Sequence, residues 1–132
     1  MLSIPVCNGE LVDKLTILKI KMTRTSGEKL QNVKTEYDHL YPFLSHIGMT
    51  EEHELFQELY TVNLTLWEFQ DWQRVFFRAK EDVSFERLDI TVFRRLRDEH
   101  LFNDRRAKAK KKINQLTNSE LVEEKQFTDY HI

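Results

Sequence analysis

The feature that most limits the fold is a stretch of some thirty residues, from Thr50 to about Lys80, that contains neither glycine nor proline. Its apolar side chains recur every three or four residues, which is the spacing of one face of an α-helix. Thr50 is a good N-cap residue, so the stretch predicts a single helix of roughly 45 Å. The apolar face consists of Leu55, Leu59, Val62, Leu66 and Phe69.

The helical pattern resumes after a short break. Glu81-Asp82-Val83 predicts a turn, Ser84 predicts a helix N-cap, and apolar positions then recur to about Thr117. A connection this short makes the two helices, about 50–80 and 85–117, lie antiparallel and side by side. We therefore expect an all-α helical bundle that is built on this long hairpin.

Two shorter helices are expected to precede the hairpin and to pack on it. An extended N-terminus at residues 1–8 leads into the first helix, for which Asn8 predicts the N-cap. Thr25-Ser26-Gly27-Glu28 fits a capping box at the start of the second helix. Pro42 removes a backbone donor and is expected to kink or end that helix.

Composition fits long helices with solvated outer faces. The 132 residues contain three glycines and two prolines, and 20 basic residues are mixed with 22 acidic ones. We expect one domain over residues 1–132, with a C-terminal tail at 118–132. The balanced charge argues against a nucleic-acid partner or a membrane surface. Six of the eight residues from Arg105 to Lys112 are cationic, but a helix spreads them around its circumference, which predicts a solvated surface.

The cellular location is predicted from what the chain lacks. No apolar run is long enough to cross a membrane, and the N-terminus has neither the basic nor the apolar region of a signal peptide. We therefore expect a cytoplasmic protein. Cys7 is the only cysteine, which rules out an internal disulfide, and it is expected to be a small buried apolar group.

Polar residues occupy positions where the long helices should carry core residues. Asn103, Lys110 and Asn114 share one face of the second long helix, where a purely structural helix would have leucine or isoleucine. In an antiparallel hairpin whose facing residue numbers sum to about 166, Asn63 lies level with Asn103. The two polar stripes are expected to form a cleft for an anionic or phosphorylated small molecule, such as a nucleotide sugar. The candidate ligand-binding residues are Asn63, Asp71, Arg74, Asn103, Arg106, Lys110 and Asn114.

The chemistry of these side chains suggests their roles. Arginine and lysine form charge-assisted hydrogen bonds with phosphate or carboxylate. Asp71 and Asp104 are candidate ligands for Mg²⁺, a hard cation that prefers oxygen, and magnesium is the one cofactor considered. A transition-metal site is not expected, because a di-iron bundle needs two Glu-x-x-His motifs and only Glu36-Tyr37-Asp38-His39 matches.

The same residues support a second hypothesis. Buried or half-buried ion pairs can fix the register of helices, in which case the protein is a structural or adaptor module with no catalytic activity. The exposed length of the hairpin and its aromatic content favour a homodimer. A third hypothesis, a helical enzyme similar to chorismate mutase with cations facing an acidic substrate, rests on fold analogy alone. Whether any reaction is catalysed stays open.

Several motifs along the chain form a recognisable set, which consists of Gly9 to Lys21, Asn63, Leu66-Trp67, Asp71 to Arg74, Asn103 to Arg106, Lys110, Ile113-Asn114 and Ser119 to Lys125. With these motifs, most of the chain resembles an uncharacterised family of small helical proteins and domains found in bacteria and their phages. The central motif of that family usually has an acidic residue where this chain has Gln70, which weakens Gln70 and Asp71 as a metal-binding pair.

This resemblance implies a biological context. Members often occur near glycosyltransferase and surface-polysaccharide genes, which points to carbohydrate or nucleotide-sugar chemistry. The family implies no particular reaction.

Overall fold

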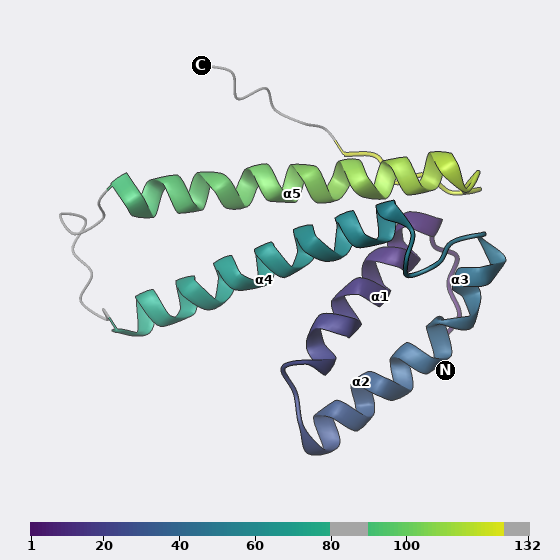
Figure 1. Cartoon of the computed structure of the whole chain (residues 1–132), viewed down its shortest axis with the longest axis horizontal. Helices are drawn as coiled ribbons and strands as arrows, with labels where there is room; N and C mark the ends of the chain where they lie inside the picture. Colours follow the sequence, from purple (N-terminus) through teal and green to yellow (C-terminus); the bar gives the residue numbers. More distant parts are fainter. Residues whose placement is uncertain (80–89, 126–132) are drawn as a thin grey trace.

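The computed structural model describes residues 1–79 and 90–125, and there it is all helical, as expected (Figure 1). The turn and helix cap expected at residues 81–84 fall outside these ranges. The described helices are α1 (Asn8–Met22), α2 (Gly27–Leu40), α3 (Pro42–His46), α4 (Glu54–Ala79) and α5 (Ile90–Leu116).

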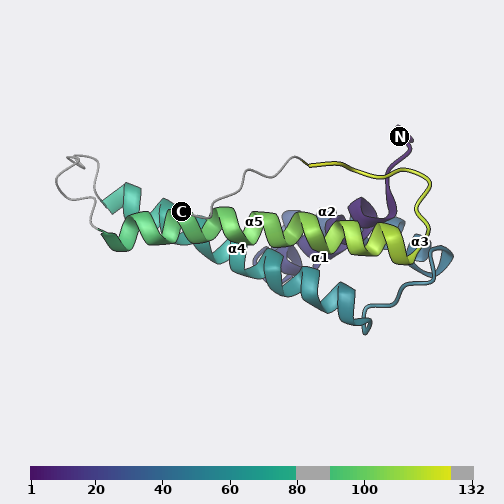
Figure 2. The same ribbon diagram turned by 90° about the horizontal axis from the view of Figure 1, so that it is seen from above.

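Helices α4 and α5 lie side by side and antiparallel, and they form the framework of the molecule (Figures 1 and 2). The predicted hairpin is thereby confirmed. Helix α1 packs against both, and α2 lies on the outer side of α1, so this second pair covers one end of the hairpin (Figure 1). The opposite end, at Ala79 and Ile90, projects beyond α1 and α2 (Figure 2).

The register of the hairpin differs from the expected one. Lys112 pairs with Glu58 at 3.8 Å, and the rings of Phe69 and Phe102 pack with centroids 5.7 Å apart. Residues of α4 therefore face positions roughly four places, or about one helical turn, further along α5 than expected. Asn63 is consequently not level with Asn103. The expectation centred the hairpin near position 83, whereas the packed pairs centre it about two positions further along the chain.

Two of the expected helix caps are absent. Asn8 is already the first residue of α1, and its side-chain amide donates to Thr117 Oγ1 at 3.0 Å instead of capping the helix. Ser26 occupies the N-cap position of α2 but makes no capping hydrogen bond, so the predicted capping box does not form. The expected break at Pro42 is confirmed, since α2 ends at Leu40 and α3 begins at the proline.

Helix α4 begins later than Thr50, at Glu54. The peptide N–H of His53 donates to the carbonyl of Thr50 at 3.2 Å, which closes a turn before the helix. The imidazole Nδ1 of His53 then accepts from the N–H of Leu55 at 3.0 Å. A histidine ring therefore satisfies the backbone donor that the threonine was expected to satisfy. The helix continues to Ala79, the last described residue before the gap, and the end expected near Lys80 lies outside the described residues.

The apolar core lies where α1 crosses the two long helices. Cys7 is buried beside this region, as expected for a small apolar group. In the described ranges, no helix is long and apolar enough to cross a bilayer. The core cluster consists of Val12, Leu15, Leu44, Met49, Phe56, Leu59, Ala109 and Ile113.

A second buried stripe on α1 is polar, and it positions the candidate site. Gly9, Asp13, Thr16 and Ile20 follow one another at four- and three-residue intervals and share a face. All four are buried. This face meets the N-terminal half of α4 and the C-terminal half of α5, so its polar groups require partners there.

Candidate functional site

The carboxylate of Asp13 is the centre of a buried polar cluster. Asp13 is 1% exposed, and it receives a two-pronged ion pair from Arg106 of α5. Arg106 Nε donates to Oδ1 at 3.0 Å and Nη2 donates to Oδ2 at 2.5 Å. Such paired hydrogen bonds fix both distance and orientation. The hydrogen bond to Asp13, together with its charge, outweighs burial and raises the pKa of Arg106.

Helix α4 contributes one side chain to this cluster. Asn63 Nδ2 donates to Asp13 Oδ1 at 2.8 Å and to Thr16 Oγ1 at 2.9 Å. The hydroxyl of Thr16 donates in turn to the carbonyl of Asp13 at 2.7 Å. We refer to Asp13, Thr16, Asn63 and Arg106 as the buried cluster. It joins α1, α4 and α5, and most of its hydrogen-bonding capacity is satisfied internally.

Lys110 lies next to the buried cluster, one turn further along α5. Its Nζ contacts Glu10 Oε2 at 2.7 Å and Glu123 Oε2 at 2.7 Å, and it lies 3.9 Å from Asp13 Oδ2. Only 10% of the side chain is exposed. Burial acts to lower the pKa of Lys110, but the hydrogen bonds to the two glutamates and the charge of Asp13 outweigh it, so the pKa is raised. The lysine is therefore held as a cation.

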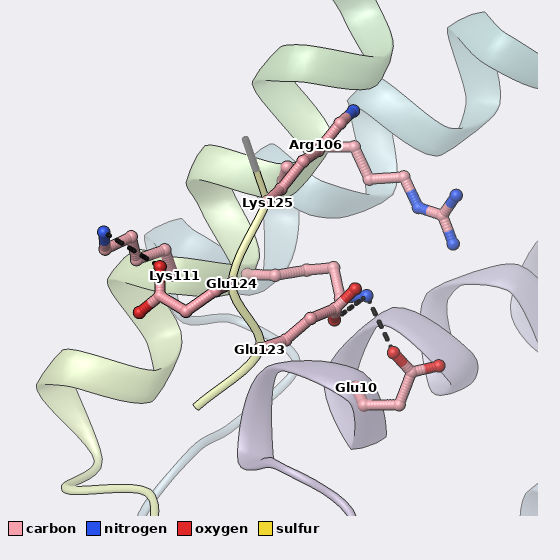
Figure 3. Close-up of a pocket in the computed structure, with 8 residues that line it drawn as sticks. Glu10, Arg106, Lys111, Glu123, Glu124 and Lys125 are labelled. Atoms are coloured by element: carbon pink, nitrogen blue, oxygen red, sulfur yellow. Dashed lines mark hydrogen bonds and ion pairs between the residues drawn. The ribbon is translucent and has the colours of Figure 1, made fainter. Parts of the chain in front are cut away.

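A cleft of about 310 Å³ opens beside Lys110, between α1, α5 and the returning chain. Figure 3 shows the chain at residues 123–125 crossing this cleft, with Glu123 directed toward Glu10 and Glu124 directed to the opposite side, toward Lys111. Lys111 Nζ lies 3.9 Å from Glu124 Oε2. The cleft is lined by Glu10, Arg106, Ala107, Lys110, Lys111, Glu123, Glu124 and Lys125.

One wall of the cleft depends on a close approach of α1 to α5. The N–H of Gly9 donates to Asn114 Oδ1 at 2.6 Å. A Cβ atom at Gly9 would lie 2.5 Å from the carbonyl oxygen of Lys110, so only glycine fits without movement of the helices. Asn114 is buried, and its Nδ2 has no hydrogen-bond partner among the residues that the structure describes.

The structure brings together four of the predicted site residues around α1. Asn63 and Arg106 bind Asp13, Lys110 binds Glu10, and Asn114 binds the backbone of Gly9. The two polar stripes of the hairpin therefore meet on a third helix and not directly on each other. Asn103 lies half-buried on α5, three residues before Arg106 on the same face.

Asp71 and Arg74 lie away from this assembly. Both are exposed on α4, and Arg74 Nη1 contacts Asp71 Oδ1 at 3.4 Å. They are eight and eleven residues beyond Asn63, on the part of α4 that projects past α1. Among the described helices, no third one packs on them, and their side chains are 51% and 64% exposed.

The two candidate magnesium ligands are each paired with a cation. Asp71 contacts Arg74, and Asp104 contacts Lys125 at 3.4 Å. Nowhere in residues 1–79 and 90–125 do three or more His, Cys, Asp or Glu side chains gather as they would around a metal ion. The lining of the cleft mixes lysines and an arginine with carboxylates.

The candidate residues predicted from the sequence do not include the acidic partners of the site, which are Asp13, Glu10 and Glu123. Asp13 and Glu10 were visible as a Glu-x-x-Asp pair one helical turn apart. The sequence signal for Asp13 is its helical spacing from Gly9 and Thr16, which places it on the same face of α1 as these two residues, next to the apolar residues of that helix. No periodic signal marks Glu123, because it follows the end of α5.

Comparison with known proteins gives a family without an assigned activity. The family model described as "Family of unknown function (DUF6165)" matches residues 2–130. No curated protein and no solved structure matches the chain.

Proposed function

The chain belongs to DUF6165, a family of unknown function, and we propose that it binds a small anionic molecule, with phosphate or carboxylate groups, in the cleft beside Lys110. The observation that carries this proposal is the state of Lys110. Its amine is nearly buried and held as a cation, and it nevertheless lines an open cleft. A cation placed in this way is preorganised to receive an anionic oxygen.

The buried cluster supports the proposed site by holding α5 in place beside the cleft. Asp13 holds Arg106 by two hydrogen bonds, and Asn63 holds Asp13 from the opposite helix. These contacts fix the backbone of α5 at the cleft, so Lys110 and Lys111 project from a rigid element. Arg106 and Asn63 therefore act in the proposal as positioning residues. Lys110 and Lys111 contact the ligand.

Phosphate esters fit this cleft better than apolar ligands do. The lining carries four cations, against three carboxylates, which are Glu10 of α1 and two residues of the returning chain. The cations are Arg106, Lys110, Lys111 and Lys125, and the returning chain contributes Glu123 and Glu124. The space of about 310 Å³ lies at the lower end of small-molecule sites and suits a phosphorylated fragment. Nucleotide sugars, with their diphosphate, are the proposed natural class. Mg²⁺ would bind only together with the phosphates, because the carboxylates of the cleft are paired with lysines and form no group, among the described residues, that could hold a metal ion.

A thermal-melting experiment tests the proposal. The full chain is heated with inorganic pyrophosphate, a nucleoside diphosphate or a nucleotide sugar, each with and without Mg²⁺. A ligand present at 100 times its Kd stabilises the folded state by about 2.7 kcal/mol. We expect stabilisation of the wild type that Lys110→Met abolishes. Lys34→Met, at an exposed position on α2, is the matched control and should keep it. Equal stabilisation of all three proteins would contradict the proposal.

A second candidate function is supported by the projecting end of the hairpin. Val75, Phe77, Ile90 and Phe93 are exposed there, with 48–69% of each residue accessible. Apolar side chains grouped at one end of a molecule often mark a protein interface. We propose a homodimer through this end as the alternative, in which the protein serves as a structural or adaptor module. The two functions use opposite ends of the hairpin and are compatible.

A further inference from the structure

The segment that follows α5 turns back along that helix. Ser119 fixes its beginning, because the N–H of Ser119 donates to the carbonyl of Asn114 at 2.9 Å and the hydroxyl accepts from the N–H of Asn8 at 2.9 Å. Further along, Lys125 contacts Asp104, which lies on α5 more than two helical turns before the end of that helix at Leu116. We call residues 119–125 the tail segment.

The tail segment places carboxylates on the cations of the cleft. Glu123 lies 2.7 Å from the amine of Lys110, and Glu124 lies 3.9 Å from the amine of Lys111 (Figure 3). Lys110 and Lys111 are the same cations that the proposed function assigns to an anionic ligand. Two adjacent carboxylates thus occupy the positions that the anionic groups of such a ligand would take.

The glutamates of the tail segment are exposed to solvent, which weakens their ion pairs with the lysines. The side chains of Glu123 and Glu124 are 54% and 74% exposed, and ion pairs at such positions are largely screened by solvent. Lys110, by contrast, keeps its partner Glu10 at 2.7 Å when Glu123 leaves. Displacing the tail segment beyond Ser119 therefore removes the exposed carboxylates of Glu123 and Glu124 from Lys110 and Lys111 and leaves the hydrogen bonds of the buried cluster intact.

We infer that the tail segment is a displaceable strap, and that the natural ligand carries two adjacent anionic groups which replace the carboxylates of Glu123 and Glu124. This inference rests on the proposed function. Consecutive residues in an extended chain direct their side chains to opposite sides, so Glu123 reaches Lys110 and Glu124 reaches Lys111 on the two sides of the strap. The two anionic groups of the ligand would take these two places. Ligand binding and strap release are then one event, and the strap lowers the apparent affinity for any anion.

The test measures the affinity of the full chain for inorganic pyrophosphate by isothermal titration calorimetry at low ionic strength. Glu123→Gln removes the carboxylate that contacts Lys110 and keeps the shape of the side chain. Glu120→Gln removes the same charge from the same segment, at an exposed position outside the cleft lining. We expect Glu123→Gln to bind pyrophosphate roughly 3- to 10-fold more tightly than the wild type, and Glu120→Gln to match the wild type within about twofold.

A second measurement follows the strap in the unaltered protein and needs no variant. The heteronuclear ¹⁵N NOE of residues 121–125 should fall when the wild type is saturated with pyrophosphate, while that of the α5 residues 106–114 stays high. Equal affinities of the wild type and Glu123→Gln, with an unchanged NOE, would overturn the strap and leave the anion site standing. Absence of pyrophosphate binding in both proteins would overturn the anion site itself, and the strap with it.

Discussion

Arg106 and Asp13 lie 93 residues apart in the sequence and form a two-pronged ion pair across the junction of α5 and α1. The carboxylate is almost fully buried, whereas the guanidinium side chain is 33% exposed. A buried charge with one partner removed is strongly destabilising, even where the pair as a whole contributes little. This pair therefore specifies how α1 seats on the hairpin, and with it the geometry of the cleft.

The first prediction concerns the energy coupling of this pair. Asp13→Ala should lower the free energy of unfolding by about 3–5 kcal/mol, because Arg106 and Asn63 lose their shared acceptor. Arg106→Met should also destabilise, since it leaves a buried carboxylate. The double variant should be more stable than the sum of the two effects implies, by about 1–3 kcal/mol. Urea denaturation measures all three, and additivity within about 0.5 kcal/mol would show that the pair does not act as a unit.

The second prediction concerns the close approach at Gly9. In a free helix, Gly→Ala stabilises by about 1 kcal/mol. Here the added methyl would meet the carbonyl of Lys110, so Gly9→Ala should destabilise by about 1–3 kcal/mol. The opposite sign makes the test decisive. Thermal denaturation checks it, with Ala substitution at Gly27 as the control. Gly27 has nothing within 4 Å of a Cβ and costs only the strain of its positive φ. A stabilised Gly9→Ala protein would refute the packing of α1 on α5.

The third prediction concerns alkaline pH. The pKa of Lys110 is raised in the folded state, so its contribution to stability is complete below the pKa of an unfolded lysine, about 10.4. That contribution is lost as the pH rises through the higher folded value. The stability difference between the wild type and Lys110→Met should therefore stay constant up to about pH 10 and shrink above it. Denaturation curves from pH 7 to 11.5 measure the difference. A gap that closes below pH 9 would contradict the environment described for Lys110.

The fourth prediction concerns the projecting end of the hairpin. If this end joins two copies of the chain, Phe93→Glu should shift the sedimentation equilibrium from dimer to monomer, because a carboxylate cannot be buried unpaired. Phe43→Glu replaces an aromatic residue of similar exposure on α3, far from that end, and should leave the dimer intact. A wild type that is monomeric at every concentration would eliminate the homodimer. Equal disruption by both variants would place the interface elsewhere.

Helix periodicity predicted the elements well, because it depends on local spacing. The seam from Leu55 to Phe69 indicated the long helix α4, and Pro42 indicated the boundary between α2 and α3. The first residue of each helix was harder to predict, because an N-cap depends on hydrogen-bond geometry that the spacing of apolar residues does not reveal. Thr50 is a favourable N-cap residue by type, and yet His53 supplies the acceptor for the first turn of α4.

The contacts around the proposed site could be predicted only in part, for a similar reason. Polar residues at core positions pointed to Asn63 and Arg106 as groups that need partners, and both have partners in the structure. Their common partner, Asp13, comes from a third helix, and only the packing of α1 across the hairpin reveals it. Asp71 follows the same pattern on α4, but α1 does not extend that far, so the residue is exposed.

The most direct test of this account is the affinity of the full chain for inorganic pyrophosphate when single lysines are replaced. We expect Lys110→Met to lower the affinity by at least about tenfold, which corresponds to the loss of roughly 1.4 kcal/mol from one charge-assisted contact. Lys34→Met should match the wild type. Pyrophosphate binding that survives Lys110→Met unchanged would contradict the claim that this cleft is the anion site.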